Sequence, residues 1–321
     1  MHEQAGAPQV NSRTTCILAG APIAVEIRAR VRADVLGFRR RHGTLPTLAV
    51  LHVGRSAEFA VYARQIVRTC DRVGIVAREE RLAGRASAAG LRERLRELSS
   101  DPGVTGVILQ LPLPRRISLR AVVGELDPAK DVDGITPLNA GLLAMGYPAF
   151  APATAQAAAE ILDRSGRSLE GLHAVVIGRS NVVGRPVAQL LLRRHCTVTI
   201  CHTRTRDLGS HTRQADVLVV AAGSPGLVRG DMLKPGATVV DVGTTVVDGR
   251  IVGDVDATSA AGVAGVVTPV PGGVGPVTNA VLMEHVMLAA RNLAAAERAR
   301  RPTGRSGRIA PASPGTGLRR R

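Results

Sequence analysis

The chain contains very few aromatic residues and almost no lysine. Its 321 residues include three phenylalanines, two tyrosines and no tryptophan. Proteins that hold single-stranded nucleic acids stack bases on aromatic rings, so this scarcity argues against a base-stacking surface. Lys130 and Lys234 are the only lysines among the 42 basic residues. Because arginine replaces lysine throughout the chain, the loss of a lysine at one site must be weighed against this general bias.

Closely spaced cysteines are also missing. The four cysteines of the chain, Cys16, Cys70, Cys196 and Cys201, form no C-x-x-C pair. Disulfide-rich domains and structural zinc sites both depend on paired cysteines. The eight histidines show no H-E-x-x-H or comparable spacing of metal ligands. We therefore predict no bound metal and a reducing, cytoplasmic location.

The chain lacks any long hydrophobic run. The longest apolar stretches, such as those at 174–177 and 217–222, are far shorter than the roughly 18 residues that suggest a membrane-spanning helix. Residues 1–13 contain no basic stretch followed by an apolar segment, as a secretory signal would. We expect no membrane span, no secretory signal and no membrane partner.

The positive charge is concentrated at the C-terminal end. The formal net charge is +16, and residues 298–321 hold eight arginines and no acidic residue. This segment is rich in proline, glycine and serine and has no apolar periodicity, a composition typical of disorder. We interpret it as a disordered, solvated tail. Nucleic-acid binding through its arginines is the less favoured alternative.

Strand-like and helical patterns alternate along the first half of the chain. They occur in the order strand, helix, strand, helix, strand at 47–53, 57–73, 75–81, 88–98 and 104–109. This order predicts a parallel sheet covered by helices. Glycine and proline interrupt the periodicity around 146–152, where we expect a hinge between domains.

A second series of strands begins at residue 173. Its members are expected at 174–177, 197–201, 217–221 and 238–242. A short helix at 187–192 joins the first two, as in a Rossmann-type dinucleotide fold. We therefore predict a two-domain α/β protein. Its parts are an N-terminal α/β domain at 14–148, a Rossmann-type domain at 149–275, a C-terminal helix at 276–297 that returns to the first domain, and the tail at 298–321.

The segment at 174–186 has the pattern of a dinucleotide-binding turn. A buried strand runs into Gly178, which lets the backbone approach a pyrophosphate closely, and a helix begins near Gly184. The usual G-x-G-x-x-G is absent, because Ser180 stands at the third position. By glycine spacing alone, an ordinary tight turn between a strand and a helix is an equally good interpretation.

The next strand indicates which dinucleotide is bound. NAD-binding folds place an acid near the end of this strand for the ribose hydroxyls, whereas NADP sites prefer a cation. Here Thr203 and Arg204 follow the strand, and the first acid is Asp207. Arg179 and Arg204 can bind a 2′-phosphate through forked, charge-assisted hydrogen bonds, so NADP is the predicted cofactor. In so arginine-rich a chain, either can also be an ordinary surface residue.

Three further segments have an unusual composition. They read Q-L-P-L-P at 110–114, K-D-V-D-G at 130–134 and T-P-V-P-G-G-V-G-P at 268–276. Each is placed to open onto the crevice at the carboxyl ends of parallel strands. Together with 178–186, in this order and spacing, they resemble the methylenetetrahydrofolate dehydrogenase/cyclohydrolase family, and the resemblance extends over residues 16–291.

The resemblance implies a fold and an activity. The fold would be a folate-binding α/β domain followed by a Rossmann-type NADP domain, commonly assembled as a homodimer. The activity would be oxidation of 5,10-methylenetetrahydrofolate by NADP. In bifunctional members, hydrolysis of the methenyl product to 10-formyltetrahydrofolate would follow.

Residue roles follow from the same resemblance. Tyr62 would lie against the folate, Gln110 would bind and polarise groups near the reacting carbon, and Asp133 would hydrogen-bond the pterin ring. The loop over the folate would be Pro271, Gly272 and Gly273, and the cofactor would be lined by Gly178, Arg179, Ser180, Thr203, Arg204 and Thr244. Taken singly, half-buried packing for Tyr62, a strand cap for Gln110 and a turn for Asp133 are ordinary alternatives.

The position of the family's catalytic lysine departs from the family pattern. The family has a lysine four residues after the tyrosine, and Ile66 occupies this position in the sequence Y-A-R-Q-I. The general drift from lysine to arginine does not explain an apolar residue, and isoleucine cannot transfer a proton. We therefore predict a dehydrogenase with little or no cyclohydrolase activity. The alternative is a catalytically impaired paralogue that binds folate or NADP and regulates or scaffolds a partner enzyme.

Overall fold

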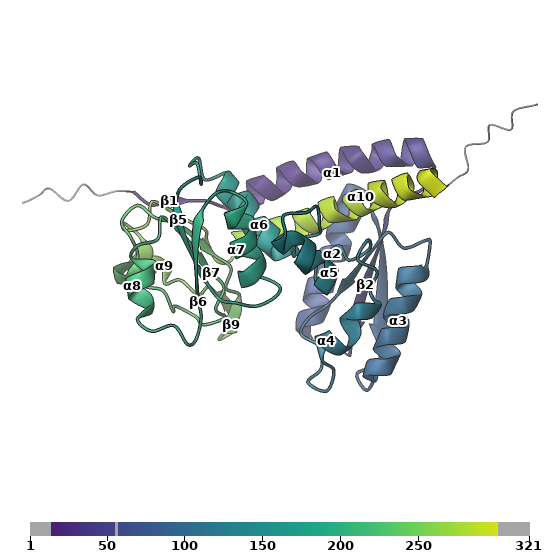
Figure 1. The fold of residues 1–321 in the computed structure, drawn as a ribbon, viewed down its shortest axis with the longest axis horizontal. Helices are drawn as coiled ribbons and strands as arrows, with labels where there is room; N and C mark the ends of the chain where they lie inside the picture. Colours follow the sequence, from purple (N-terminus) through teal and green to yellow (C-terminus); the bar gives the residue numbers. More distant parts are fainter. Residues whose placement is uncertain (1–13, 55–56, 301–321) are drawn as a thin grey trace, which may run out of the picture.

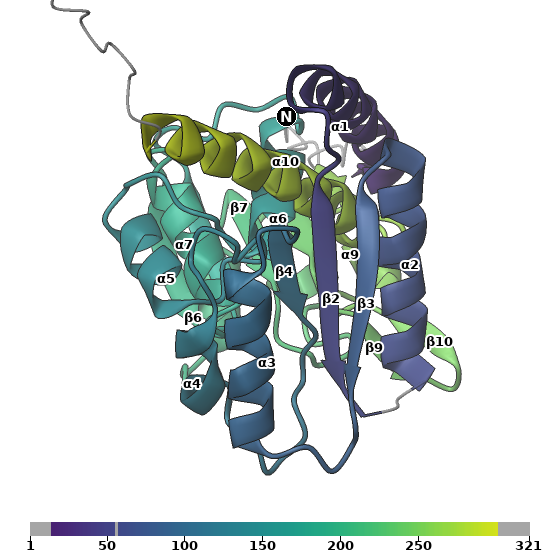
Figure 2. The same cartoon turned by 90° about the vertical axis from the view of Figure 1, so that its right-hand side faces the viewer.

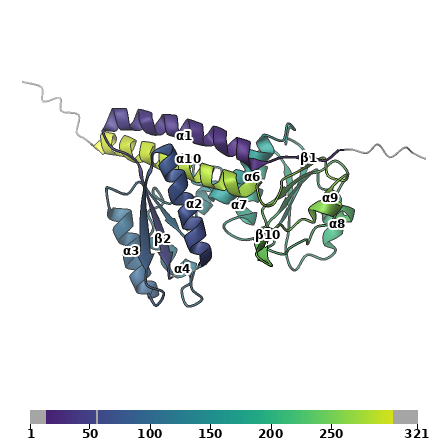
Figure 3. The same cartoon turned by 180° about the vertical axis from the view of Figure 1, so that it is seen from behind.

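Two lobes and a pair of long helices make up the protein (Figure 1). The computed structural model describes residues 14–54 and 57–300. Each lobe is built around its own parallel sheet, and helices α1 (Gly20–His42) and α10 (Val274–Arg300) run side by side from the edge of the second lobe across the first (Figure 1, Figure 3). The predicted two-domain α/β architecture is confirmed.

The first sheet has three parallel strands in the order β3-β2-β4. The central strand β2 (Thr47–Val53) is flanked by β3 (Val76–Leu82) and β4 (Gly106–Leu109). Helix α2 (Ala57–Val73) covers one face and α3 (Ala88–Ser100) the other (Figure 2). All five elements begin and end within two residues of the predicted ranges.

The side chains of β2 alternate between two cores. Leu48 and Val50 belong to the large core formed with α1, α2 and α10, whereas Leu51 and Val53 pack with α3. This alternation is the geometric consequence of a pleated strand. It places His52 on the same face as Leu48 and Val50, which is the face that α2 covers.

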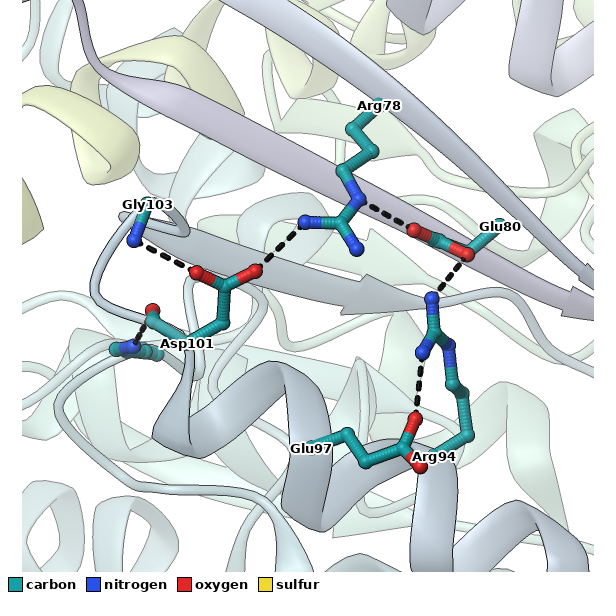
Figure 4. Close-up of polar contacts among 7 residues, drawn as sticks. Arg78, Glu80, Arg94, Glu97, Asp101 and Gly103 are labelled. Carbon is teal, nitrogen blue, oxygen red and sulfur yellow. Dashed lines mark hydrogen bonds and ion pairs between the residues drawn. The ribbon is translucent and has the colours of Figure 1, made fainter.

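Ion pairs fix α3 against β3 (Figure 4). The Arg78 guanidinium lies between Glu80 and Asp101, and its Nη1 is 2.7 Å from Asp101 Oδ2. From α3, Arg94 Nη2 lies 2.6 Å from Glu80 Oε2. The ammonium group of Lys130 donates to the backbone carbonyl of Asp101 at 2.6 Å. The network therefore connects α3 to the 130–134 segment as well as to the strand.

The second sheet has six parallel strands in the order β1-β11-β8-β7-β5-β6. They are β1 (Cys16–Ile17), β5 (His173–Ile177), β6 (Thr197–Cys201), β7 (Val217–Val220), β8 (Thr238–Asp241) and β11 (Val266–Val267). The four strands predicted in this half are present, each within one residue of its predicted bounds.

The strand β1 corrects one detail of the predicted domains. Residues from 14 onward were assigned to the N-terminal domain, but Cys16 pairs with Val266 in the sheet of the second lobe. The backbone N–H of Cys16 donates to Gly265 O, and that of Leu18 donates to Val267 O. A strand of two residues carries no periodic signal, so only its pairing with a distant segment reveals where it lies.

Shorter elements complete the lobes. They are α4 (Leu119–Val122), α5 (Pro137–Ala144), α6 (Ala153–Asp163), α7 (Gly184–Leu192), α8 (Leu208–Thr212), α9 (Ala257–Ala260), the 3-10 helices η1 (Val123–Glu125) and η2 (Gly230–Met232), and the hairpin strands β9 (Thr245–Val247) and β10 (Arg250–Val252). The predicted hinge at 146–152 is the connection between α5 and α6.

Helix α10 is longer than the helix predicted at 276–297. It begins at Val274, inside the glycine-rich loop segment, and continues to Arg300. It packs against α1, α2 and β4, as a helix returning to the first domain should, and also against α6. The first residues of the predicted tail are therefore helical, and its remaining part, 301–321, lies outside the described residues. None of the described helices is long and apolar enough to cross a membrane.

Candidate active site

Gln110 stands directly after β4, at the carboxyl edge of the first sheet. Its backbone N–H donates to Leu51 O at 2.9 Å, which extends the pairing of β4 with β2. The side chain is only 4% exposed, and neither its Nε2 nor its Oε1 has a partner among the described residues. Leaving a buried polar group unpaired costs about 1–3 kcal/mol, so this amide is poised for a ligand or a water molecule.

The two aspartates of the 130–134 segment have different surroundings. Asp131 is fully buried and accepts hydrogen bonds from the backbone N–H groups of Ile135 and Thr136 and from the Asn139 amide. Three donors on one carboxylate make Asp131 the organiser of the turn. This arrangement leaves Asp133 as the aspartate that is available for substrate.

Asp133 lies at the edge of the turn with part of its surface accessible. Its Oδ1 accepts one hydrogen bond, from the backbone N–H of Ala153 at 3.2 Å. The pKa of this carboxyl is raised to about 7, mainly by burial. The Ala153 hydrogen bond opposes this rise, and the nearby charge of Asp131 adds to it. The next residue must be glycine, because a Cβ on Gly134 would lie 2.3 Å from Phe150 O.

Tyr62 and Asp133 lie far apart in the sequence, yet the charge of Asp133 influences the Tyr62 phenol. Tyr62 is partly buried on α2 and packs against the large core. Burial raises the pKa of the Tyr62 phenol, and the charge of Asp133 raises it further, so the two groups lie within electrostatic range. The phenol therefore keeps its proton throughout the neutral pH range.

Ile66 follows Tyr62 one turn later on α2 and is fully buried in the same core. Residues four apart lie on one face of a helix, so Ile66 is directed toward the sheet as Tyr62 is. It presents only methyl and methylene groups to this region. The position where the resemblance expects an ionisable group is therefore part of the hydrophobic packing.

His52 is a polar residue at this edge that the sequence analysis did not identify. In the register of the sheet, Leu51 pairs with Leu109, so His52 and Gln110 are the next neighbours on β2 and β4. Its Nδ1 is buried without a partner among the described residues. The available signal was one polar side chain within an otherwise apolar strand, 48–53.

Two glycines shape the turn between β5 and α7. Gly178 has φ +120°, and a Cβ there would lie 2.3 Å from Ala221 O. A Cβ on Gly184 would lie 2.1 Å from the carbonyl oxygen of Gly178. Ser180 Oγ accepts hydrogen bonds from the N–H groups of Val183 and Gly184. The turn thus brings the backbone and the N-terminus of α7 close together, as a pyrophosphate site requires.

The predicted phosphate-binding side chains lie exposed near this turn. Arg179 and Ser180 follow β5, and Thr203 and Arg204 follow the neighbouring strand β6. The ion pairs within the described part of the chain do not include Arg179 or Arg204. The residues present therefore fit a dinucleotide with an additional phosphate, because exposed guanidinium groups without acidic partners favour an anion.

Two buried aspartates hold the loops that follow β7 and β8. Asp241 accepts hydrogen bonds from the backbone N–H groups of Gly243, Asp254 and Val255. Asp254 in turn accepts three from the loop after β7, donated by Ala222, Gly223 and Ser224 at 2.7–2.8 Å. No sequence pattern marks either residue for a role. They fix the backbone at the end of the sheet where Thr244 lies exposed.

The loop before α10 is anchored to the second sheet and to the start of α1. The N–H of Gly20, the first residue of α1, donates to Gly272 O at 2.8 Å. On the other side, Thr268 Oγ1 accepts from the N–H of Asp241. Pro271 is exposed and Gly273 is buried, and a Cβ on Gly20 would lie 1.9 Å from Gly273 O. The loop therefore spans from the second sheet to the start of the helix that joins the lobes.

A hollow of about 450 Å³ lies at the carboxyl ends of β8 and β11, against β10. Its walls include Asp241, Ile251, Thr268 and Val270. Because none of the twelve predicted site residues lines it, this hollow is not the site that those residues form.

Two family models match the chain. The model of the tetrahydrofolate dehydrogenase/cyclohydrolase catalytic domain matches residues 18–133, and that of its NAD(P)-binding domain matches residues 152–294. A relative in Parvibaculum lavamentivorans, "Bifunctional protein FolD", is 48% identical over 285 residues, which cover 86% of this chain and 96% of the relative. A protein of the same name in Sorangium cellulosum is 50% identical over 276 residues, 85% of this chain and 96% of the relative.

Solved structures agree with these matches. The bifunctional methylenetetrahydrofolate dehydrogenase/cyclohydrolase from Campylobacter jejuni superposes with a TM-score of 0.85 at 37% identity, covering 87% of this chain and 99% of its own. The methylenetetrahydrofolate dehydrogenase-cyclohydrolase from Trypanosoma brucei was solved with NADP cofactor and inhibitor. It superposes with a TM-score of 0.84 at 33% identity, covering 88% of this chain and 99% of its own.

Proposed function

The chain belongs to the tetrahydrofolate dehydrogenase/cyclohydrolase family, and from this premise we propose that it oxidises 5,10-methylenetetrahydrofolate to 5,10-methenyltetrahydrofolate. NADP, when bound, accepts the hydride that leaves the one-carbon unit. The observation that carries the proposal is the Gln110 amide, which is buried and without a partner at the carboxyl edge of the first sheet. A buried polar group without a protein partner is completed by a ligand or by bound water, and the place of Gln110 at the carboxyl edge of the sheet favours a ligand.

We assign the cofactor side to residues of the second lobe. Gly178 and the N-terminus of α7 would hold the pyrophosphate, because the turn allows close approach and the helix end offers unpaired N–H groups. Arg179 and Arg204 would bind the 2′-phosphate, with Ser180 and Thr203 beside them. Thr244 would line the cofactor from the loop that Asp241 fixes.

The folate side is assigned to residues of the first lobe. Tyr62 keeps its proton and offers a flat apolar ring with a polar tip to the pterin. Asp133, whose pKa is raised to about 7, can hydrogen-bond the pterin as an acceptor or as a donor near neutral pH. Hydride transfer mainly requires that the two reacting carbons are placed against each other, which such contacts achieve.

Hydrolysis of the methenyl product is proposed to be slow or absent. This step needs an activated water molecule and proton transfer during ring opening. Ile66 is fully buried among apolar side chains and has no proton to exchange. Gln65, the neighbouring polar residue, is exposed on another face of α2.

Absorbance assays with wild-type protein and an Ile66→Lys variant test both parts of the proposal. We expect wild-type protein to reduce NADP with methylenetetrahydrofolate and to hydrolyse methenyltetrahydrofolate no faster than buffer. The lysine variant should gain at least tenfold in hydrolysis, because general acid–base groups contribute roughly 10²–10⁴-fold.

An Ile66→Met variant is the matched control for a change in packing without a charge, and it should remain unable to hydrolyse. Wild-type hydrolysis at a rate comparable to dehydrogenation would refute the monofunctional assignment. Absence of NADP reduction would refute the dehydrogenase itself.

The alternative of a regulatory paralogue finds no support. Both domains match the family models, and the relatives that cover nearly the whole folded chain are named as bifunctional enzymes. The buried, unpaired Gln110 also indicates a site kept for a ligand.

A homodimer in the cytoplasm is proposed as the working state. The hairpin of β9 and β10 stands apart from both large sheets and exposes Val246, Val247 and Ile251 at 58%, 41% and 47%. Exposed apolar side chains that gather on one element mark an interaction surface. All four cysteines are free thiols, which favours a reducing compartment.

A further inference from the structure

Three polar side chains form a row along the carboxyl edge of the first sheet. They are Arg81 on β3, His52 on β2 and Gln110 after β4. Arg81 pairs in register with His52, and Gln110 follows the pair Leu51–Leu109. Neighbouring parallel strands lie about 4.8 Å apart, so residues in register on one face are direct neighbours. The row lies on the face that α2 covers.

Two adjacent members of this row, His52 and Gln110, both have buried polar atoms without a partner among the described residues. Gln110 is 4% exposed with both amide atoms unpaired, and His52 Nδ1 is buried without a partner among the described residues. A native structure pairs more than about nine in ten of its buried polar groups, so two adjacent exceptions require an explanation. A bound polar ligand that reaches both side chains explains them together.

The chemistry of the row defines that ligand. Burial lowers the pKa of His52, the positive charge of Arg81 lowers it further, and Glu79 opposes both. The imidazole is therefore neutral at neutral pH and offers one donor and one acceptor nitrogen. The Gln110 amide offers a donor and an acceptor beside it. Such a pair suits an uncharged, nitrogen-rich ring system rather than a phosphate or carboxylate.

We propose that His52 is a folate-contacting residue, which acts with Gln110 as a hydrogen-bonding pair at the folate end of the site. The proposal rests on the proposed function, because it takes a reduced folate as the ligand. Ile66 supplies no polar atom to this region, so His52 is the additional polar group that the sheet itself provides. Its role is to bind and orient the substrate, and no proton transfer is assigned to it.

Two substitutions at this position separate a contact from a packing effect. His52→Leu removes the hydrogen bonds and suits the apolar strand. His52→Gln retains a neutral donor and acceptor. His42→Leu, at the far end of α1, is the matched control for loss of a histidine. The readouts are KM for methylenetetrahydrofolate, KM for NADP, kcat, thermal midpoint, and the Kd for tetrahydrofolate from calorimetry.

We expect His52→Leu to raise the folate KM and the tetrahydrofolate Kd about tenfold, with the NADP KM unchanged, as loss of a substrate hydrogen bond predicts. His52→Gln should recover most of the loss, and His42→Leu should match wild type. An unchanged folate KM in His52→Leu would overturn the inference. So would a parallel rise of both KM values with a lowered thermal midpoint, because that pattern indicates a structural role.

Failure of the proposed function gives a different pattern. Wild-type protein that binds tetrahydrofolate without reducing NADP refutes the dehydrogenase, while the calorimetric comparison still decides the role of His52. Wild-type protein that turns over, with an unaffected His52→Leu variant, refutes this inference alone. Wild-type protein that binds no tetrahydrofolate refutes both.

Discussion

Asp133 ionises in an unusual range for an aspartate, since burial raises its pKa to about 7. The folded protein therefore keeps this proton up to a higher pH than the unfolded chain, in which aspartates titrate near pH 4. Between these values the folded state binds more protons, so the free energy of unfolding decreases as pH rises from about 4 to about 7. Above this window the contribution is constant.

An Asp133→Asn variant tests this residue. It mimics the protonated carboxyl, so the pH-dependent loss should disappear. Between about pH 5 and pH 8, wild-type protein should lose on the order of 2–3 kcal/mol of unfolding free energy that the variant retains. Denaturant titrations at both pH values measure the difference. Parallel curves for the two proteins would show that Asp133 ionises normally.

The loop after β7 is held by one buried carboxylate, that of Asp254, which is itself tied to Asp241 at the end of β8. Asp254 accepts three backbone N–H groups from residues of this loop, and its own N–H donates to Asp241 at the end of β8. The loops after β7 and β8 lie at the carboxyl ends of parallel strands, where α/β proteins bind their ligands. The Asp254 side chain therefore sets the shape of the loop after β7, at the rim where we propose that the cofactor binds.

An Asp254→Asn variant should lose both stability and cofactor affinity. The amide cannot accept three N–H groups and brings a donor of its own, so we expect a loss of roughly 3 kcal/mol in unfolding free energy. The NADP KM should rise more than the folate KM. Asp256→Asn, at the N-cap of the short helix α9, makes the same chemical change but keeps a capping side-chain oxygen, and it should leave the NADP KM unchanged. An unaltered NADP KM in Asp254→Asn would contradict this role for the loop.

At the scale of the molecule, α1 and α10 join the two lobes. Ion pairs of Arg30 with Glu284 and of Arg291 with Asp34 connect the helices. The 268–273 loop is hydrogen-bonded to the first residue of α1. Hydride transfer requires that groups held by separate lobes keep a fixed distance, and this pair of helices provides the common support.

The proposed dimer is also a property of the whole molecule. Replacing Val246 by glutamate places a charge in the exposed apolar surface of the hairpin, which should dissociate the dimer. Val25→Glu, at an equally exposed position on α1 (60%), is the matched control. Sedimentation of both variants should give a monomer for the first and a dimer for the second. A Val246→Glu protein that sediments as wild type would exclude the hairpin as the interface.

The sequence by itself determined the elements and the family. Strand and helix ranges such as 47–53 and 57–73 follow from local periodicity, which short segments carry independently of the rest of the chain. The four unusual segments, taken in their order and spacing, carried the resemblance to the family, and this resemblance implied a dinucleotide turn and a folate site. The family's spacing of tyrosine and lysine, applied to Tyr62, placed isoleucine at the lysine position.

The tertiary structure decided what depends on residues far apart in the sequence. Only strand pairing puts His52 beside Gln110 and assigns β1 to the second sheet. Only the folded surroundings distinguish Asp131 from Asp133. Asp131 accepts three hydrogen bonds and organises a turn, whereas Asp133 accepts one and has a raised pKa. Desolvation and cross-strand contact depend on the surroundings that the fold creates, and local sequence patterns do not contain them.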